Sequence, residues 1–399
     1  MKHLYIHIPF CHRRCAYCDF NTYANMEHRI EAYVQALCAE LAMLAKLDTG
    51  AAILSSPSET EPPSTVHRPP SPEAAALRPT IFLGGGTPTM LSLGQMERVL
   101  AAAAAIVPLD GAEISSEANP GTVLGRDYLR GLRALGVNRL SMGVQSLHDP
   151  TLRVLGRIHT AAEARASYLE AREAGFDNIN LDFIFGLPGQ DQAQWEQTLA
   201  TITGWEVDHF SLYSLILEES TPLFAQVTAG RIVVPDDDAT AGMYESAIAL
   251  LGAAGYAQYE ISNWTRGKPC QHNLAYWLNS DYLAAGAGAH GHIYPRRYAD
   301  ILGIDDYIAA VAAGRLPVAE TTPLTAHDLR AETMMMGLRL NAGVSEAHFA
   351  ARCGLSLDAA YSAALAELID QGLLERADAR VRLTERGRMF GNRVFARFL

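Results

Sequence analysis

Short apolar segments alternate with amphipathic segments along the first half of the chain. Segments with the β-branched and apolar character of buried strands lie at residues 4–9, 80–84, 113–119, 139–145, 178–186 and 210–217. Between them, patterns typical of helices occupy residues 29–47, 93–107, 127–135, 161–174 and 192–203. Strands that are separated by helices usually pair in parallel through right-handed crossovers. This half of the chain is therefore predicted to be an α/β unit with a parallel sheet.

Polar residues recur at every second position of these strands, so each strand has one polar face. The polar positions of four of these strands are His3, Tyr5 and His7; Glu113, Ser115, Glu117 and Asn119; Ser141, Gly143 and Gln145; and Asn180 and Asp182. A strand buried between two helical layers would be apolar on both faces. We therefore expect a partial (β/α)6 barrel of the TIM type with a ligand-filled lumen, and chemistry at the carboxyl ends of its strands.

Three regions are expected along the chain. The barrel occupies residues 1–220, an extension with an aromatic, Gly-rich stretch occupies residues 221–315, and a mostly helical region occupies residues 316–399. The last region ends in a hairpin pattern and a terminal helix, an order that predicts a winged-helix-like domain. Residues 48–79 interrupt the barrel with a Pro/Ser-rich insertion, which is predicted to be a mobile surface loop without chemistry of its own.

Composition narrows the class of partner. The 399 residues include 32 basic and 44 acidic side chains, which gives a net charge of −12. This balance argues against nucleic acid as a partner. No apolar run is long enough to span a bilayer, and the first residues lack the apolar core of a signal peptide. We expect a cytoplasmic protein that reaches the inner membrane, if at all, through a partner.

Three of the six cysteines lie within eight residues, directly after the first predicted strand. Cys11, Cys15 and Cys18 therefore project from one loop at the mouth of the barrel. Soft thiolates bind iron–sulfur clusters, zinc or copper(I). A structural zinc site needs a fourth ligand, which His12 offers only in a cramped geometry. Three thiolates on a four-iron cube leave one iron open to a cofactor or substrate, so the pattern favours a [4Fe–4S] cluster.

This cysteine spacing after a first strand resembles that of radical S-adenosylmethionine enzymes. Tyr17 matches the aromatic residue that the superfamily places against adenine, and residues 84–88 match its glycine-rich stretch. Glycines at the end of a strand let the backbone approach a small polar ligand closely. The resemblance implies a [4Fe–4S] cluster held by the three cysteines and bound S-adenosylmethionine.

Further segments resemble the oxygen-independent coproporphyrinogen III oxidase family. They lie at residues 5–11, 117–121, 143–146, 156–157 and 180–182. The resemblance implies that S-adenosylmethionine contacts Tyr5, Gly85, Gly86, Thr87, Glu117, Gln145, Arg157 and Asp182.

Two branches of that family differ in function. The decarboxylating oxidases have a further cysteine where this chain has Phe20, and a long arm where only ten residues precede Cys11. Both differences, and the His-Asn-x-x-Tyr-Trp element at residues 272–277, resemble the heme chaperone branch. That resemblance implies that the protein carries heme and that His272 is a heme ligand or contact. It also implies hemoproteins as recipients, among them membrane respiratory proteins. A homodimer is compatible with this resemblance. The alternative is a coproporphyrinogen III oxidase of porphyrin biosynthesis.

Overall fold

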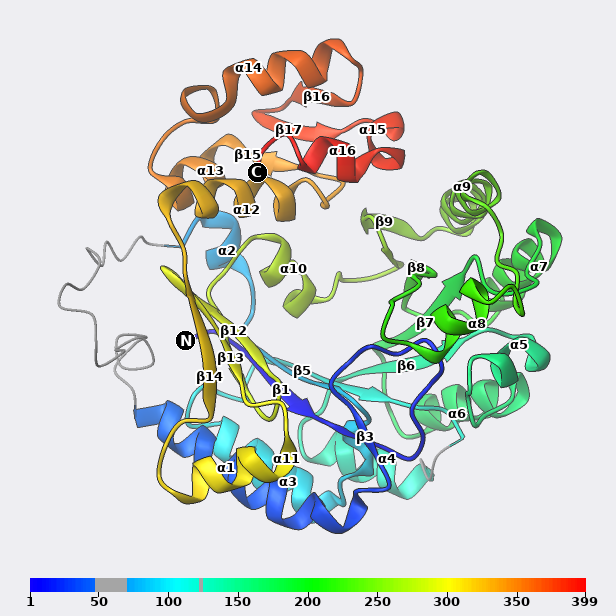
Figure 1. The fold of residues 1–399 in the computed structure, drawn as a ribbon, viewed down its shortest axis with the longest axis vertical. Helices are drawn as coiled ribbons and strands as arrows, with labels where there is room; N and C mark the ends of the chain where they lie inside the picture. Colours follow the sequence, from blue (N-terminus) through cyan, green and yellow to red (C-terminus); the bar gives the residue numbers. More distant parts are fainter. Residues whose placement is uncertain (47–69, 122–124) are drawn as a thin grey trace.

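The computed structural model describes residues 1–46, 70–121 and 125–399. A nine-stranded sheet in the order β11-β1-β4-β5-β6-β7-β8-β10-β9 forms its centre (Figure 1). Six neighbouring strands of it are all parallel: β1 (His3–Ile8), β4 (Thr80–Gly85), β5 (Glu113–Ala118), β6 (Arg139–Gln145), β7 (Ile179–Phe185) and β8 (His209–Ser214). The expected α/β class and partial barrel are confirmed.

Helices lie on the outer face of this curved sheet (Figure 1). They are α1 (Ile30–Lys46), α3 (Leu93–Ala103), α4 (Arg126–Ala134), α6 (Ala161–Glu173), α7 (Gln192–Thr203) and α9 (Asp237–Ala253). The short helix α5 (Asp149–Val154) instead ends beside the cysteine loop, where the carbonyl of Leu155 accepts a hydrogen bond from Ala16 at 2.9 Å. The apolar positions of the strands meet them: Leu4, Ile6 and Ile81 are fully buried in one large core. The alternate, polar positions are therefore left to face the lumen, as the period of two predicts.

Short strands from the extension widen the sheet at both edges, which the sequence analysis did not predict. β11 (Leu283–Ala285) pairs in parallel with β1, while β10 (Asn263–Thr265) pairs antiparallel with β8 and with β9 (Ala257–Glu260). A strand of three residues is too short to show a periodic pattern. The extension also supplies β12 (His290–Ile293) and β13 (Arg296–Asp300), which form a second sheet with β14 (Val318–Pro323). Two of its helices are α8 (Pro222–Thr228) and α11 (Ile304–Ala312).

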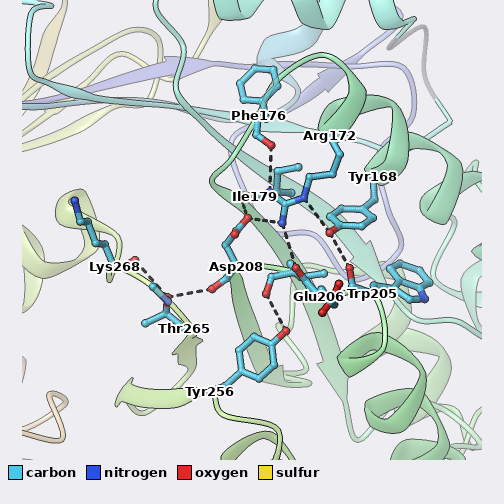
Figure 2. A network of polar contacts seen from close by, with 12 residues as sticks. Tyr168, Arg172, Phe176, Ile179, Trp205, Glu206, Asp208, Tyr256, Thr265 and Lys268 are labelled. Atoms are coloured by element: carbon cyan, nitrogen blue, oxygen red, sulfur yellow. Dashed lines mark hydrogen bonds and ion pairs between the residues drawn. The ribbon is translucent and has the colours of Figure 1, made fainter.

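Asp208, which precedes β8, links three elements near the start of β7 (Figure 2). Its carboxylate accepts a hydrogen bond from the backbone N–H of Ile179, the first residue of β7, at 2.9 Å. The same carboxylate pairs with Arg172 of α6 at 2.6 Å, and its backbone carbonyl accepts from the Thr265 hydroxyl of β10 at 3.0 Å. Arg172 also donates to the hydroxyl of Tyr168 at 3.0 Å. The network ties a covering helix and an added strand to the end of the barrel opposite the cysteines.

Residues 326–398 contain a separate apolar core. It lies among α12 (Ala326–Gly337), α13 (Glu346–Cys353), α14 (Leu357–Asp370), α15 (Glu385–Met389), α16 (Gly391–Phe395) and a small sheet of β15 (Val344–Ser345), β16 (Leu374–Ala377) and β17 (Arg380–Leu383). The predicted order of helices, hairpin and terminal helix is present. Among the described residues, every helix is too short or too polar to cross a bilayer.

The end of the predicted insertion is structured, contrary to the expectation of a surface loop. Residues 48–69 lie outside the described residues, but Pro72–Ala76 forms helix α2, which has Ser71 as its N-cap. The Ser71 hydroxyl hydrogen-bonds to His348 of α13 at 2.6 Å, and Glu73 pairs with Arg380 of β17. Lys2 also donates to the carbonyl of Ala75 at 2.8 Å. A short proline-led helix shows no amphipathic period of its own, so the sequence pattern did not predict it.

Candidate cluster and cofactor site

The three clustered cysteines lie on the loop that follows β1. Cys11 ends β2 (Phe10–Cys11), which pairs in parallel with β3 (Tyr23–Ala24) and closes the base of the loop. All three side chains are half-buried, and all three line one cavity of about 460 Å³ at the carboxyl ends of the barrel strands. Topology thus brings the thiols to the place where barrels of this kind bind their ligands.

The thiols fit a four-iron cluster in their chemistry, because cysteine thiolates are its usual protein ligands and each one binds a different iron atom. Within the described part of the chain, no group of three His, Cys, Asp or Glu side chains is placed to hold a single metal ion. Burial raises the pKa of Cys11 to about 11 and also raises that of Cys18. Both thiols therefore hold their protons until iron displaces them.

Arg157 is buried beside the cysteines. It donates to the sulfur of Cys15 at 3.4 Å, to the side-chain oxygen of Asn119 at 2.7 Å and to the carbonyl of Gly143 at 2.5 Å. The Asn119 amide in turn donates to the hydroxyl of Thr87 at 2.7 Å. A fixed cation at this position offsets the negative charge of thiolates in a site of low dielectric constant.

Two carboxyl groups line the same cavity as the cysteines and repel each other. Glu117 accepts from the backbone N–H of Gly85 at 3.0 Å, and Asp182 accepts from Asn180 at 2.7 Å and from Ser141 at 3.3 Å. Burial, with added repulsion from Asp182, raises the pKa of Glu117 to about 7. Burial also raises the pKa of Asp182. A cationic ligand is therefore favoured here, because it relieves the repulsion between the two groups.

The glycine-rich end of β4 leaves no room for side chains. A Cβ atom on Gly86 would lie 2.5 Å from the carbonyl oxygen of Phe10, and one on Gly85 would lie 2.3 Å from the ring of His7. Gly85 also has a φ of +104°, which L side chains rarely adopt. Gln145, at the end of β6, has a φ of +68°, and such strain in a non-glycine residue is typical of functional sites.

The structure brings most of the sequence-predicted residues to the same cavity. Its lining includes the three cysteines together with Tyr17, Gly85, Gly86, Glu117, Gln145, Arg157 and Asp182. Tyr5 instead lines an adjoining cavity of about 670 Å³. Thr87 is buried behind the loop, where its hydroxyl donates to the sulfur of Cys11 at 3.7 Å.

His272, the predicted heme ligand or contact, lines neither of these two cavities. It lies on α10 (Gln271–Trp277), a helix between the barrel and α12 (Figure 1). Its Nδ1 is 2.7 Å from the hydroxyl of Thr80, the first residue of β4, and its Nε2 is 2.9 Å from the hydroxyl of Tyr276. Its backbone N–H donates to Glu113, the first residue of β5, at 3.1 Å.

These contacts place His272 at the amino ends of the strands, opposite the cysteines. Only 2% of the residue is exposed, and burial lowers its pKa to about 3, so the imidazole is neutral. Both ring nitrogens are engaged in hydrogen bonds, which leaves neither free for iron. Helix α10 closes the lumen at the amino ends of the strands, and the hydrogen bonds of His272 hold the helix there.

The lining includes residues that sequence reasoning did not assign to the site. Ser141 was among the predicted polar positions, but a polar face alone does not separate ligand contacts from structural hydrogen bonds. Tyr213 lies on β8, a strand for which no polar positions were predicted. Asn119 was part of a recognised segment, and its two side-chain partners give it a positioning role. Phe20 lines both cavities and is 62% exposed, an unusual state for so large an apolar side chain.

Two family models match the chain. The radical SAM superfamily matches residues 73–202, and the HemN C-terminal domain matches residues 324–390. Among solved structures, the coproporphyrinogen III oxidase HemN of Escherichia coli superposes with a TM-score of 0.80 over 99% of this chain and 89% of its own, at 24% sequence identity. That likeness establishes the fold.

Curated relatives match the chain over its full length. The heme chaperone HemW of Bacillus subtilis is 37% identical over 100% of this chain and 99% of its own. The heme chaperone HemW of Escherichia coli is 36% identical over 99% of this chain and 97% of its own. A mitochondrial relative from Bos taurus, radical S-adenosyl methionine domain-containing protein 1, is 36% identical over 87% of this chain and 75% of its own.

Proposed function

We propose that this chain, which belongs to the HemW family of heme chaperones within the radical SAM superfamily, carries heme to membrane hemoproteins. It holds a [4Fe–4S] cluster through Cys11, Cys15 and Cys18 and binds S-adenosylmethionine in the cavity beside them. It works in the cytoplasm and meets the inner membrane through its recipients, among them respiratory proteins. The observation that carries the proposal is a cavity lined by the three thiols and by polar lumen residues, which adjoins a second cavity lined by aromatic residues.

The protein's own groups have separate tasks in this proposal. When bound, the cluster supplies one iron with an open coordination position, which suits the amino and carboxylate groups of S-adenosylmethionine. Arg157 offsets the charge of the thiolates, and Glu117 and Asp182 hold the polar and cationic parts of the cofactor. Gly85 and Gly86 expose backbone groups to it, and Tyr17 covers the adenine.

Phe20 favours a carrier over a decarboxylating enzyme. It stands where the oxidases of the resembling family have another cysteine, and it presents an apolar surface to both cavities. An apolar wall suits a porphyrin face and contributes no group for proton or hydrogen transfer.

Two assays on the anaerobically reconstituted protein test the proposal. The first is transfer: heme-loaded protein should pass heme to an apo-hemoprotein in membrane vesicles faster than free heme at the same concentration enters it. The second is turnover of coproporphyrinogen III with reductant and S-adenosylmethionine, which should yield no protoporphyrinogen. Protoporphyrinogen formed with matching release of carbon dioxide would replace the carrier with an oxidase. A protein that binds no heme would also exclude the carrier.

A further inference from the structure

The cavity beside the cluster site has the size and lining of a porphyrin pocket. Its volume of about 670 Å³ lies within the range of roughly 300–1,000 Å³ usual for ligand sites. Three tyrosines, Tyr5, Tyr276 and Tyr282, line it, and the rings of the last two pack edge to face at 4.6 Å. It shares Phe20 and Glu117 with the cluster cavity, so the two cavities adjoin.

Four histidines lie in or near this cavity, and three of them are not available to a metal. His7 has its Nδ1 at 2.9 Å from the hydroxyl of Tyr5 and its Nε2 at 2.9 Å from the carbonyl of Asn21. His272 also uses both ring nitrogens, as described above. His292 is 1% exposed, packs against a tyrosine ring and is absent from the lining.

His290 differs from these three. It lines the cavity and is exposed, and within the described part of the chain its ring forms no hydrogen bond or ion pair. An exposed imidazole with both nitrogens free at the wall of an aromatic cavity has the properties of an axial ligand to heme iron.

The backbone around His290 is fixed, so the ring is presented from a defined position. His290 begins β12, where it pairs with Ala299 of β13. In the preceding loop, a Cβ atom on Gly286 would lie 2.5 Å from the carbonyl oxygen of His7, and one on Gly288 would lie 2.4 Å from the amide of Asn21. Asn21 itself donates to the carbonyl of Ala287 at 2.9 Å. A ligand held by rigid elements loses little entropy when it binds a metal.

The remaining walls suit the other parts of heme. Phe20 and Leu302 line the cavity, yet they are 62% and 59% exposed, so a macrocycle packed on them would remove two large apolar side chains from water. Arg14 lies at the exposed part of the lining, where a guanidinium group can pair with a propionate.

We propose that heme sits in this cavity with His290 as the axial ligand to its iron, and that His272 acts only at a distance, by holding Tyr276 in the cavity wall. The inference rests on the proposed heme-carrying function and assigns its ligand. It also explains how the His-Asn-x-x-Tyr-Trp element serves heme binding without coordinating iron.

The test compares His290→Ala with His272→Gln and with His327→Ala, which removes an exposed histidine far along the chain on α12. Each reconstituted protein is titrated with heme, and the iron ligand is identified by electron paramagnetic resonance of ¹⁵N-histidine-labelled protein. We expect His290→Ala to lose the imidazole signature and to bind heme about tenfold or more weakly. Free imidazole should restore the signature. His327→Ala should match the wild type, and His272→Gln should keep the imidazole signature.

The outcomes separate this inference from the function on which it rests. Heme bound by His290→Ala with an unchanged imidazole signature would overturn the assignment of His290 and leave the carrier function intact. Loss of the signature in His272→Gln, with iron content and circular dichroism as in the wild type, would overturn it as well. A wild-type protein that binds no heme would instead refute the proposed function itself. Phe20→Glu provides a second measurement, because it should weaken heme binding without changing the iron ligand.

Discussion

The carboxyl groups of Glu117 and Asp182 predict that S-adenosylmethionine binding depends on pH. Burial and repulsion raise the pKa of Glu117 to about 7, so the ligand-free protein is a mixture of protonated and ionised forms near neutrality. A cofactor with a sulfonium charge favours the ionised form. By linkage, the affinity should therefore rise with pH through the pKa of the ligand-free protein and level off above it.

The size of the effect follows from the fraction of ionised Glu117. With a pKa of about 7, roughly a tenth of the groups are ionised at pH 6 and roughly nine tenths at pH 8. If only the ionised form binds well, the affinity rises about tenfold between these values, or about 1.4 kcal/mol. Calorimetric titration of the anaerobically reconstituted protein measures this change, and cluster absorbance at each pH confirms that the site is intact.

Two variants separate the contribution of Glu117 from the titration of the ligand itself. Glu117→Gln should bind S-adenosylmethionine more weakly, and its affinity should rise less steeply with pH than that of the wild type. The difference between these two slopes is the decisive quantity. Asp182→Asn removes the repulsion and should shift the rise toward lower pH. Equal slopes in the wild type and Glu117→Gln would show that the pair does not control binding.

Two further predictions concern the cluster and the buried acids. Replacing Cys15 by Ala should abolish cluster assembly, measured as iron and sulfide per chain. The same change at Cys38 should leave iron and sulfide near wild-type values. A cluster in the Cys15 variant would contradict the ligand assignment. Burial raises the pKa of Glu40, which is 1% exposed, from 4.5 to about 7 in the folded protein. The contribution of Glu40 to stability is therefore fully present below its unfolded pKa and is lost as the pH rises from about 4.5 to 7. Urea unfolding at pH 5 and pH 8 measures this loss, which is on the order of 3 kcal/mol at most in the wild type. Glu40→Gln should show a smaller loss. The same pH dependence in the variant and the wild type would refute the role of Glu40.

The barrel was predictable because its strands follow a simple period. Polar lumen positions alternate with apolar ones, and β6 has the predicted bounds, Arg139–Gln145. The positions of the cluster loop and of Glu117, Gln145 and Asp182 follow from that period, because parallel strands bring their carboxyl ends to one edge. Strand β11 was not predictable in this way, since it is three residues long and depends on pairing with β1, a strand far earlier in the chain.

The placement of His272 depends on contacts that the sequence around it does not specify. The motif at residues 272–277 combines a histidine with two aromatic residues, which is a combination expected of a heme contact. The actual environment of His272 depends on Thr80, 192 residues away, and on Glu113, 159 residues away, both at the amino ends of strands. A local motif contains no information about which end of the lumen its helix closes. The same limit applies to His290, whose exposure depends on a loop packed against Asn21.

The cluster loop forms a wall of both cavities, and this joins cluster assembly to heme binding. Few backbone hydrogen bonds hold the centre of the loop: Ala16 donates to Leu155 at 2.9 Å and accepts from Leu223 at 2.9 Å, and Cys18 donates to Cys15 at 3.3 Å. A cube bound by three thiolates would add three covalent links to this segment. Phe20 lies two residues beyond the last of these cysteines and faces both cavities. A cluster that fixes the loop therefore also fixes one wall of the porphyrin pocket, even though no cysteine needs to touch heme.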